Sequence, residues 1–257
     1  MRKIDDEIQA LLSEHRGDIR SILKDNHRLD LLYALSSQRE LLLEWYDFEP
    51  EAEVLQVGAD YGALTGLLRS SVSAVTVLDD TESALETVRQ RYPGAANIHY
   101  HKDSLTGYAA EACAEGKKYD YVIFAGTLTA PYEDHIHAAK ALLKPEGILI
   151  VASANALGMK YFAGTVEEEN ALTKRQLMEL LCGDKENQSM AEENGALKFY
   201  YPMPDYKTPV SIYSDAYLPK KGDLTRVTPA YDYPPYHMME QGEKFDTVCE
   251  AGLFDLY

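Results

Sequence analysis

The chain has 257 residues, of which 46% are hydrophobic, so it can bury a full core in one domain with additions. Its 25 lysines and arginines against 42 aspartates and glutamates give a formal net charge of −17. Because nucleic-acid affinity depends largely on cations that neutralise phosphates, this balance disfavours a nucleic-acid partner. No apolar run approaches the roughly 18 residues of a membrane span. The three cysteines are widely spaced, which predicts a reducing, cytoplasmic setting and no metal cluster.

The first 48 residues are predicted to be helical. Apolar residues recur there at helical spacing, as in Ile19, Ile22 and Leu23, and Pro50 ends the segment. The polar start of the chain is followed by no apolar run, so it does not predict a signal peptide. We expect residues 1–50 to form a helical cap that packs over a sheet. A cover over a bound molecule and an oligomer contact are the alternatives.

Residues 53–152 alternate between the patterns of strands and helices. Strands are expected at 53–57, 74–79, 96–101, 119–124 and 146–152, and helices at 62–70, 81–91, 107–115 and 132–143. Such alternation predicts a mainly parallel sheet with helices on both faces, which is a Rossmann-like, doubly wound α/β fold.

After residue 152 the alternation stops. A short amphipathic helix is expected at 174–181, and two β-rich stretches at 199–201 and 210–213 could form a hairpin. The remaining chain is rich in tyrosine and proline without strong periodicity. We therefore divide the chain into the cap, an α/β domain at 51–214 that includes a lid or insert at 153–182, and an irregular C-terminal extension at 215–257.

A glycine loop follows the first predicted strand. Gly58 and Gly62 can let the backbone approach a ligand closely, and the N-terminus of the helix behind them can meet negative charge. The spacing, with Gly66 four residues further on, differs from the Gly-x-Gly-x-x-Gly of dinucleotide-binding proteins. A strand-to-helix turn that binds nothing is the alternative.

Carboxylates follow the second and third predicted strands. Asp79 could accept hydrogen bonds from two ribose hydroxyls, or Asp80 if the register differs by one, and Asp103 could receive the exocyclic amine of an adenine. Solvated loop acids are the alternative. Because parallel strands end at one edge of a sheet, these acids and the glycine loop predict a pocket for an adenosine-containing small molecule. Ala125, after the fourth strand, is expected to line the same cleft.

The order of these strands, the glycine loop and the carboxylates resembles that of class I S-adenosylmethionine-dependent methyltransferases, over roughly residues 50–152. Residues 119–123 are similar to the fourth-strand motif of that family, and residues 142–150 to the approach to its fifth strand. The resemblance implies S-adenosylmethionine as the cofactor and no metal. The expected cofactor-binding residues are Gln56, Gly58, Asp60, Gly62, Asp79, Asp103 and Ala125.

Two segments of the second half narrow the resemblance. Residues 155–164 and 199–207 are similar to parts of bacterial methyltransferases that occur beside, or fused to, glycosyltransferases in surface-polysaccharide clusters. This implies a small-molecule or glycan-type acceptor and a role in polysaccharide biosynthesis, with a homodimer or a glycosyltransferase as partner. The resemblance also implies a final antiparallel strand, which the chain ends before. Weak cofactor binding, a lost base and a fragment of a longer protein are the alternatives that follow from this and the other departures.

Several positions depart from the family pattern. Gln56 stands where the family usually has an acid that pairs with the methionine ammonium, and Asp60 replaces a glycine of the loop. Asp60 could take over the ammonium contact. The relatives carry an acidic-acidic-His-Thr-Gly run where this chain has residues 168–171. The histidine of that run is absent here. These departures favour, as the alternative, a catalytically degenerate methyltransferase-like binding or scaffolding module.

An acceptor hydroxyl would require a base, and the candidates are His135, His137, Tyr161 and Glu169. Imidazole titrates near neutral pH, although a histidine on a helix can equally belong to a solvated face. An oxidoreductase with a Tyr217-x-x-x-Lys221 pair is disfavoured, because Tyr217 lies in a proline-rich tail and residue 64 is not glycine.

Overall fold

The computed structural model describes residues 3–162, 169–203 and 205–218. The chain divides into two compact units, Met1–Ser153 and Ala154–Tyr257. Within the described ranges, no helix combines the length and the apolar character needed to cross a membrane.

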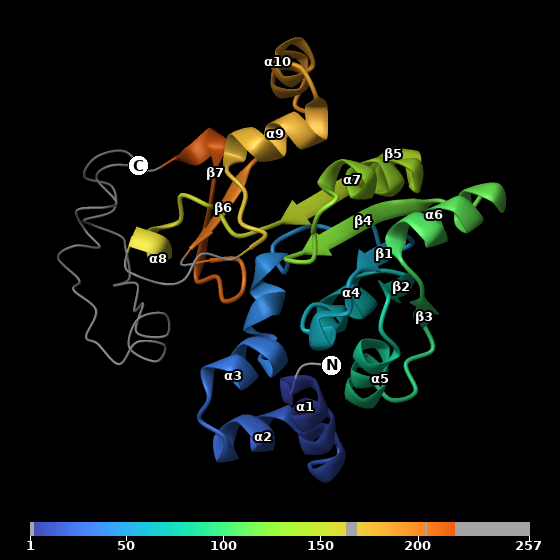
Figure 1. Ribbon diagram of the computed structural model, residues 1–257, viewed down its shortest axis with the longest axis vertical. Coiled ribbons are helices and arrows are strands. Elements are labelled where there is room, and N and C mark those ends of the chain that lie inside the picture. The colour runs from blue at the N-terminus through green and yellow to red at the C-terminus, as the bar shows by residue number, and fades with distance from the viewer. Residues whose placement is uncertain (1–2, 163–168, 204, 219–257) are drawn as a thin grey trace. The chain divides into compact units, whose positions relative to one another are not determined.

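The first unit is built on a five-stranded sheet with the order β3-β2-β1-β4-β5, in which every pair is parallel (Figure 1). The strands are β1 (Glu53–Val57), β2 (Ala74–Asp79), β3 (Ile98–Lys102), β4 (Tyr119–Ala125) and β5 (Leu143–Ala152). The order reverses at β1, and ligand crevices of open α/β sheets form outside the carboxyl ends of the strands at such a switch point. The predicted Rossmann-like, doubly wound α/β fold is confirmed.

Helices cover both faces of this sheet (Figure 1). On one face α6 (Leu105–Ala114) and α7 (Tyr132–Ala141) pack against each other, and α4 (Thr65–Ser71) and α5 (Glu82–Arg91) lie on the other. Because both faces are covered, the central strands are continuously apolar rather than alternating, as in the buried run from Tyr121 to Ala125.

The predicted helix at 62–70 is divided in the structure. A short 3-10 turn, η2 (Asp60–Gly62), comes first, and α4 begins only at Thr65. Tyr61 and Gly62 have φ angles of 54° and 72°, which no right-handed helix accommodates. The other predicted elements of this unit match the observed bounds to within three residues.

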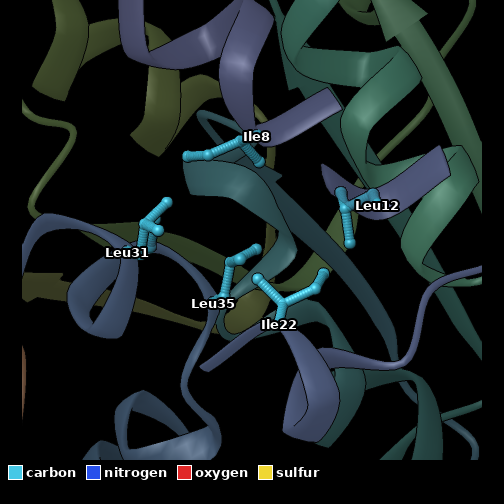
Figure 2. Packing of buried hydrophobic residues seen from close by; sticks show 6 residues of the cluster. Ile8, Leu12, Ile22, Leu31 and Leu35 are labelled. Atoms are coloured by element: carbon cyan, nitrogen blue, oxygen red, sulfur yellow. The ribbon is translucent and has the colours of Figure 1, made fainter. Parts of the chain in front are cut away.

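The N-terminal segment forms three helices and a 3-10 turn, which are α1 (Lys3–Glu14), α2 (Ile19–Asp25), α3 (Leu29–Leu35) and η1 (Ser37–Leu42). Their apolar side chains enclose a small core, shown in Figure 2, of Ile8, Leu12, Ile22, Leu31, Ala34 and Leu35. Tyr61 of the glycine loop packs against this core, and Gln9 Nε2 donates to the Ser83 carbonyl of α5 at 2.7 Å. The predicted helical segment therefore packs on α5 and on the glycine loop.

The second unit contains α8 (Met159–Phe162), α9 (Lys174–Cys182), α10 (Lys185–Glu193) and η3 (Asp215–Tyr217). The expected hairpin is present as the antiparallel strands β6 (Tyr200–Met203) and β7 (Ser211–Ser214). The helix expected at 174–181 is confirmed as α9, and a capping box between Thr173 and Gln176 starts it. The helix α10 was not predicted, because its mostly charged and polar sequence lacks an apolar period. Residues 163–168 of the predicted lid and 219–257 of the predicted extension lie outside the described residues.

Candidate cofactor site

The loop after β1 is held in a conformation that few residues adopt unaided. Gly58 and Gly62 have φ angles of 86° and 72°, and between them Asp60 and Tyr61 have φ angles of 39° and 54°. Left-handed backbone costs a residue with a Cβ roughly 1–2 kcal/mol. Such strain persists only where the surroundings over-determine it, and it is concentrated at binding and active sites.

The Gln56 side chain holds the loop by hydrogen bonds. Its side chain is buried in β1, and Nε2 donates to the carbonyls of Gly58 at 3.1 Å and Ala59 at 3.4 Å. Its Oε1 accepts from Thr65 Oγ1 at 2.8 Å. An ionised carboxylate could not donate to those two carbonyls. The glutamine therefore fits this position, because its side chain joins β1 to the loop and to the first residue of α4.

Gly58 is required by the close approach of the β4 loop. A Cβ at this position would lie 2.4 Å from Thr127 Cγ2, which is far inside contact distance. The Thr127 hydroxyl donates to the Val57 carbonyl, and the Gly58 N–H donates to the Leu78 carbonyl at 2.8 Å. The ends of β1, β2 and β4 are thus held together at the start of the loop.

Asp79 joins the end of β2 to the glycine loop. Its Oδ2 accepts from the Ala59 N–H at 2.9 Å, and its Oδ1 accepts from the Thr81 N–H at 2.9 Å and the Thr81 hydroxyl at 2.7 Å. A carboxylate offers about four acceptor sites, so the half-buried Asp79 retains capacity for a further donor. Asp80, the register alternative, is exposed.

Asp103 lies beside Asp79 on the neighbouring strand end. Its N–H donates to the Asp79 carbonyl at 3.1 Å, and its Oδ1 accepts from the Ser104 N–H at 2.7 Å. In the part of the chain that the structure describes, its Oδ2 has no hydrogen-bond partner. One carboxylate oxygen therefore remains available to an amine.

Arg39 of η1 reaches the same edge of the sheet. Its side chain is only 4% exposed, and Nη1 lies 2.9 Å from Asp60 Oδ2 in an ion pair and donates to the Ala125 carbonyl at 3.4 Å. The N-terminal cap thereby contributes a buried cation between the glycine loop and the end of β4. Sequence reasoning missed Arg39, since one arginine in a leucine-rich helical segment usually belongs to a solvated face.

The end of α5 supplies the donors that the strained loop needs. Arg91 is buried and donates to the carbonyls of Tyr61 at 3.1 Å, Ala34 at 3.3 Å and Leu35 at 2.9 Å. The Tyr92 hydroxyl donates to the Gly62 carbonyl at 2.8 Å, and burial raises the pKa of Tyr92, which keeps that donor protonated. These side chains join the cap to the loop, and sequence reasoning missed both.

The four candidate bases are divided between the two units. His135 lies half-buried in the first turn of α7, where Nδ1 donates to the Thr129 carbonyl at 2.8 Å and leaves Nε2 to accept a proton. His137 is exposed, and residues two apart do not share a helix face. Tyr161 on α8 and the exposed Glu169 belong to the second unit, where Lys160 Nζ lies 5.1 Å from the Tyr161 ring centroid.

The structure brings all seven expected cofactor-binding residues to one edge of the first unit. They lie in the last two residues of β1, β2 and β4 or in the loops after β1 and β3, and hydrogen bonds or the Arg39 ion pair link them. This edge can accept hydrogen bonds from hydroxyls and amines through two carboxylates. The same edge carries the Arg39–Asp60 ion pair, in which a buried cation faces a partly buried anion.

Several solved structures of other proteins are similar in fold to this chain. No protein-family model matches the chain, and no curated protein matches it. Among solved structures it is similar to the methyltransferase CcbJ from Streptomyces caelestis, with 23% identity over 52% of this chain and a TM-score of 0.40. That match spans 57% of the CcbJ chain.

Two further solved structures are similar to this chain. One is the N-methyltransferase NodS from Bradyrhizobium japonicum WM9 in complex with S-adenosyl-l-homocysteine, with 18% identity, 67% and 83% of the two chains covered and a TM-score of 0.44. The other is YjhP from E. coli, with 16% identity, 62% and 72% covered and a TM-score of 0.45. The fold of this chain is assigned from its own strand order.

Proposed function

We propose that this chain is a class I S-adenosylmethionine-dependent methyltransferase that acts on a small-molecule or glycan-type acceptor. The observation that carries the proposal is the pair of carboxylates at neighbouring strand ends, Asp79 and Asp103, beside a left-handed glycine loop. A nucleoside presents the matching donors, which are two ribose hydroxyls and an exocyclic amine.

The residues at this edge fit the proposed cofactor. Asp79 retains acceptor capacity for a ribose hydroxyl, and Asp103 has an oxygen available for the adenine amine. Arg39 and Asp60 would bind the carboxylate and the ammonium of the amino-acid end. When bound, the cofactor supplies an electrophilic methyl group on its sulfonium sulfur. The contribution of these residues to rate is orientation, because holding two reactants in line removes much of the entropic barrier.

A hydroxyl acceptor must lose a proton during methyl transfer, and His135 is the base that the local geometry favours. Its Nδ1 is occupied as a donor to Thr129, so Nε2 is the accepting atom. His137, Tyr161 and Glu169 remain the other candidates. An amine acceptor that is already neutral would need none of them.

The acceptor class is inferred from charge and from the second unit. A chain with a net charge of −17 disfavours nucleic acid as acceptor, and residues 155–164 and 199–207 resemble enzymes of surface-polysaccharide clusters. The proposal therefore places the enzyme in the cytoplasm in polysaccharide biosynthesis, as a homodimer or beside a glycosyltransferase. Transfer of a labelled methyl group to nucleotide sugars and short glycans is the direct test of this class.

One observation favours a second candidate function, a degenerate binding or scaffolding module. The Gln56 side chain is occupied by the loop, and Asp60 is already paired with Arg39. If the chain is such a module, no acid is available to bind the methionine ammonium. The candidate site would then bind neither the cofactor nor its demethylated product.

Calorimetric titration with S-adenosylmethionine and S-adenosylhomocysteine separates the two candidates. We expect micromolar binding by the wild-type chain and a loss of at least about 10-fold for Asp79→Asn, since a charge-assisted hydrogen bond contributes roughly 1.5–3 kcal/mol. The matched control is the exposed neighbour Asp80→Asn, which should bind like the wild type. Absence of binding at millimolar ligand would favour the degenerate module, and equal affinity of Asp79→Asn and wild type would refute the assigned pocket.

A further inference from the structure

A second group of side chains gathers where the edge strand β3 ends. His101 near the end of β3, Asp103 in the loop behind it and Glu111 on α6 each offer one ligand atom, and these atoms all lie within 4.8 Å of one another. The three residues come from a strand, a loop and a helix. His101 and Asp103 are two residues apart in the sequence, and Glu111 joins them because α6 folds back beside the end of β3.

Gly107 on α6 makes room for this arrangement. A Cβ on Gly107 would lie 2.6 Å from Asp103 Oδ1, so only glycine lets the carboxylate approach the first turn of the helix so closely. Glu111 stands four residues further along, on the same helix face and one turn above. The His101 ring is held by Tyr108 of the same helix, with ring centroids 4.5 Å apart and planes at 58°. The helix thus positions all three side chains.

The group carries negative charge that the protein leaves unbalanced. Across residues 3–162, 169–203 and 205–218, neither Asp103 nor Glu111 forms an ion pair with a lysine or arginine. Two carboxylates held so close repel each other, and each favours a cation between them. His101 and Asp103 are partly buried and Glu111 is exposed, so a cation has access from the solvent side.

We propose that His101, Asp103 and Glu111 form a site for a divalent transition-metal ion of the zinc class. One imidazole and two carboxylates are ligands that Zn²⁺ accepts, whereas Mg²⁺ and Ca²⁺ prefer oxygen alone. Ligand bonds of about 2.0–2.2 Å put neighbouring ligands of a tetrahedral ion roughly 3.3 Å apart, so the exposed Glu111 side chain closes inward by a rotamer change. Water completes the coordination.

Asp103 belongs both to this metal site and to the proposed nucleoside pocket. A bound metal ion would withdraw the Asp103 oxygen from the adenine amine, so the ion and the nucleoside compete. This consequence, unlike the metal site itself, rests on the proposed function. The two are tested separately, because metal binding can be measured in the absence of any nucleoside.

The metal site is tested by calorimetric titration of the chelator-treated full chain with Zn²⁺. The site variants are His101→Phe, which retains the ring beside Tyr108, and Glu111→Gln, which changes an exposed side chain. Each should weaken the binding of one Zn²⁺ by at least about 10-fold, since even outer-shell groups contribute that much. The matched controls, His99→Ala on the same strand and Glu115→Gln beyond the same helix, are both exposed and should bind like the wild type. Circular dichroism verifies the fold of each variant.

Two results would overturn the proposal. One is that the single variants Glu111→Gln and His101→Phe both bind Zn²⁺ as tightly as the wild type. The other is that the control variants lose as much Zn²⁺ affinity as the site variants. The competition is tested by titrating S-adenosylhomocysteine with and without Zn²⁺, where we expect weaker binding in the presence of the ion. If the metal-free chain binds no S-adenosylhomocysteine, the proposed function fails while the Zn²⁺ titration still decides the metal site.

Discussion

The two units of the chain bury charged side chains in different ways. In the first unit the buried cations Arg39 and Arg91 bind backbone carbonyls and one acid of the glycine loop. In the second unit Lys160 and Asp205 pair with each other at 3.2 Å, with side chains 5% and 7% exposed. The same Asp205 accepts from the N–H groups of Lys207 at 2.8 Å and Thr208 at 3.3 Å.

This difference indicates how each unit is stabilised. In the first unit, buried cations bind carbonyls of the glycine loop, of the end of β4 and of α3, beside a large apolar sheet core. In the second unit, one buried ion pair joins a four-residue helix to a loop, and neither α9 nor α10 has a buried residue. We therefore expect the first unit to be rigid around its loop and the second to open locally at lower free energy.

The largest effect is expected from Lys160→Met in the second unit. Removal of one partner leaves Asp205 buried without its cation, which costs about 3–5 kcal/mol. Hydrogen exchange of the full chain should show faster exchange throughout residues 169–218 and unchanged exchange in β1. The control is Lys174→Met, which breaks a more exposed pair with Asp215 and should cost below about 1 kcal/mol. Equal costs for both variants would contradict a dominant buried pair.

Glycine substitutions compare the two units directly. Gly58 and Gly183 both have positive φ, of 86° and 77°, but only Gly58 faces a neighbour that a Cβ would strike. Gly183→Ala should cost roughly 1–2 kcal/mol from backbone strain alone, and Gly58→Ala about 1–3 kcal/mol more from overpacking. Urea unfolding measures both. Thr127→Ser removes the nearest methyl group and should recover part of the Gly58→Ala loss, whereas no recovery would refute the steric explanation.

Arg91→Met tests the connection between the cap and the loop. The change leaves the carbonyls of Tyr61 and Leu35 without their donor, and an unsatisfied buried group costs roughly 1–3 kcal/mol. Hydrogen exchange should increase both in α3 and around the glycine loop. The control is Arg89→Met on the same helix. Arg89 pairs with Glu82 and Glu86, which are exposed or half-buried, so this variant should lower the free energy of unfolding by less than about 1 kcal/mol. Faster exchange in α3 alone would show that Arg91 does not hold the loop.

The smallest effect concerns pH and Glu40 of η1. Burial raises the pKa of Glu40 above its ordinary value of 4.5, and this outweighs the attraction of Arg91 and the hydrogen bond from the Leu67 N–H. The folded chain then binds the proton more tightly than the unfolded chain, so the free energy of unfolding falls as the pH rises through the window just above 4.5.

Glu40→Gln should remove this fall of the free energy of unfolding with rising pH. At neutral pH the variant should be more stable than the wild type by less than about 1 kcal/mol, because the half-exposed carboxylate is screened by solvent. The difference should disappear below pH 4.5, as measured by thermal unfolding over a pH series. The exposed Glu51→Gln is the control, with the pH dependence of the wild type. A Glu40→Gln profile parallel to the wild type would refute the assignment.

Much of the first unit could be predicted from its sequence, because its signals are local. Apolar runs bounded by turns predicted β1 and β2 to the residue, and the glycines and acids at strand ends predicted which residues share an edge of the sheet. The second unit was less predictable. Its α10 is formed by exposed charged residues without an apolar period, so nothing in the pattern distinguished it from a loop.

The sequence by itself determined the alternation of strands and helices, the glycine loop and the carboxylates Asp79 and Asp103, since each follows from neighbouring residues. Only the tertiary structure decided that Arg39 and Arg91 are buried at that loop, because an arginine shows no local sign of whether it will be buried. The meeting of His101, Asp103 and Glu111 was decided in the same way. Glu111 reaches the other two residues because α6 lies beside the end of β3, where Gly107 leaves room for Asp103 and the Tyr108 ring contacts His101.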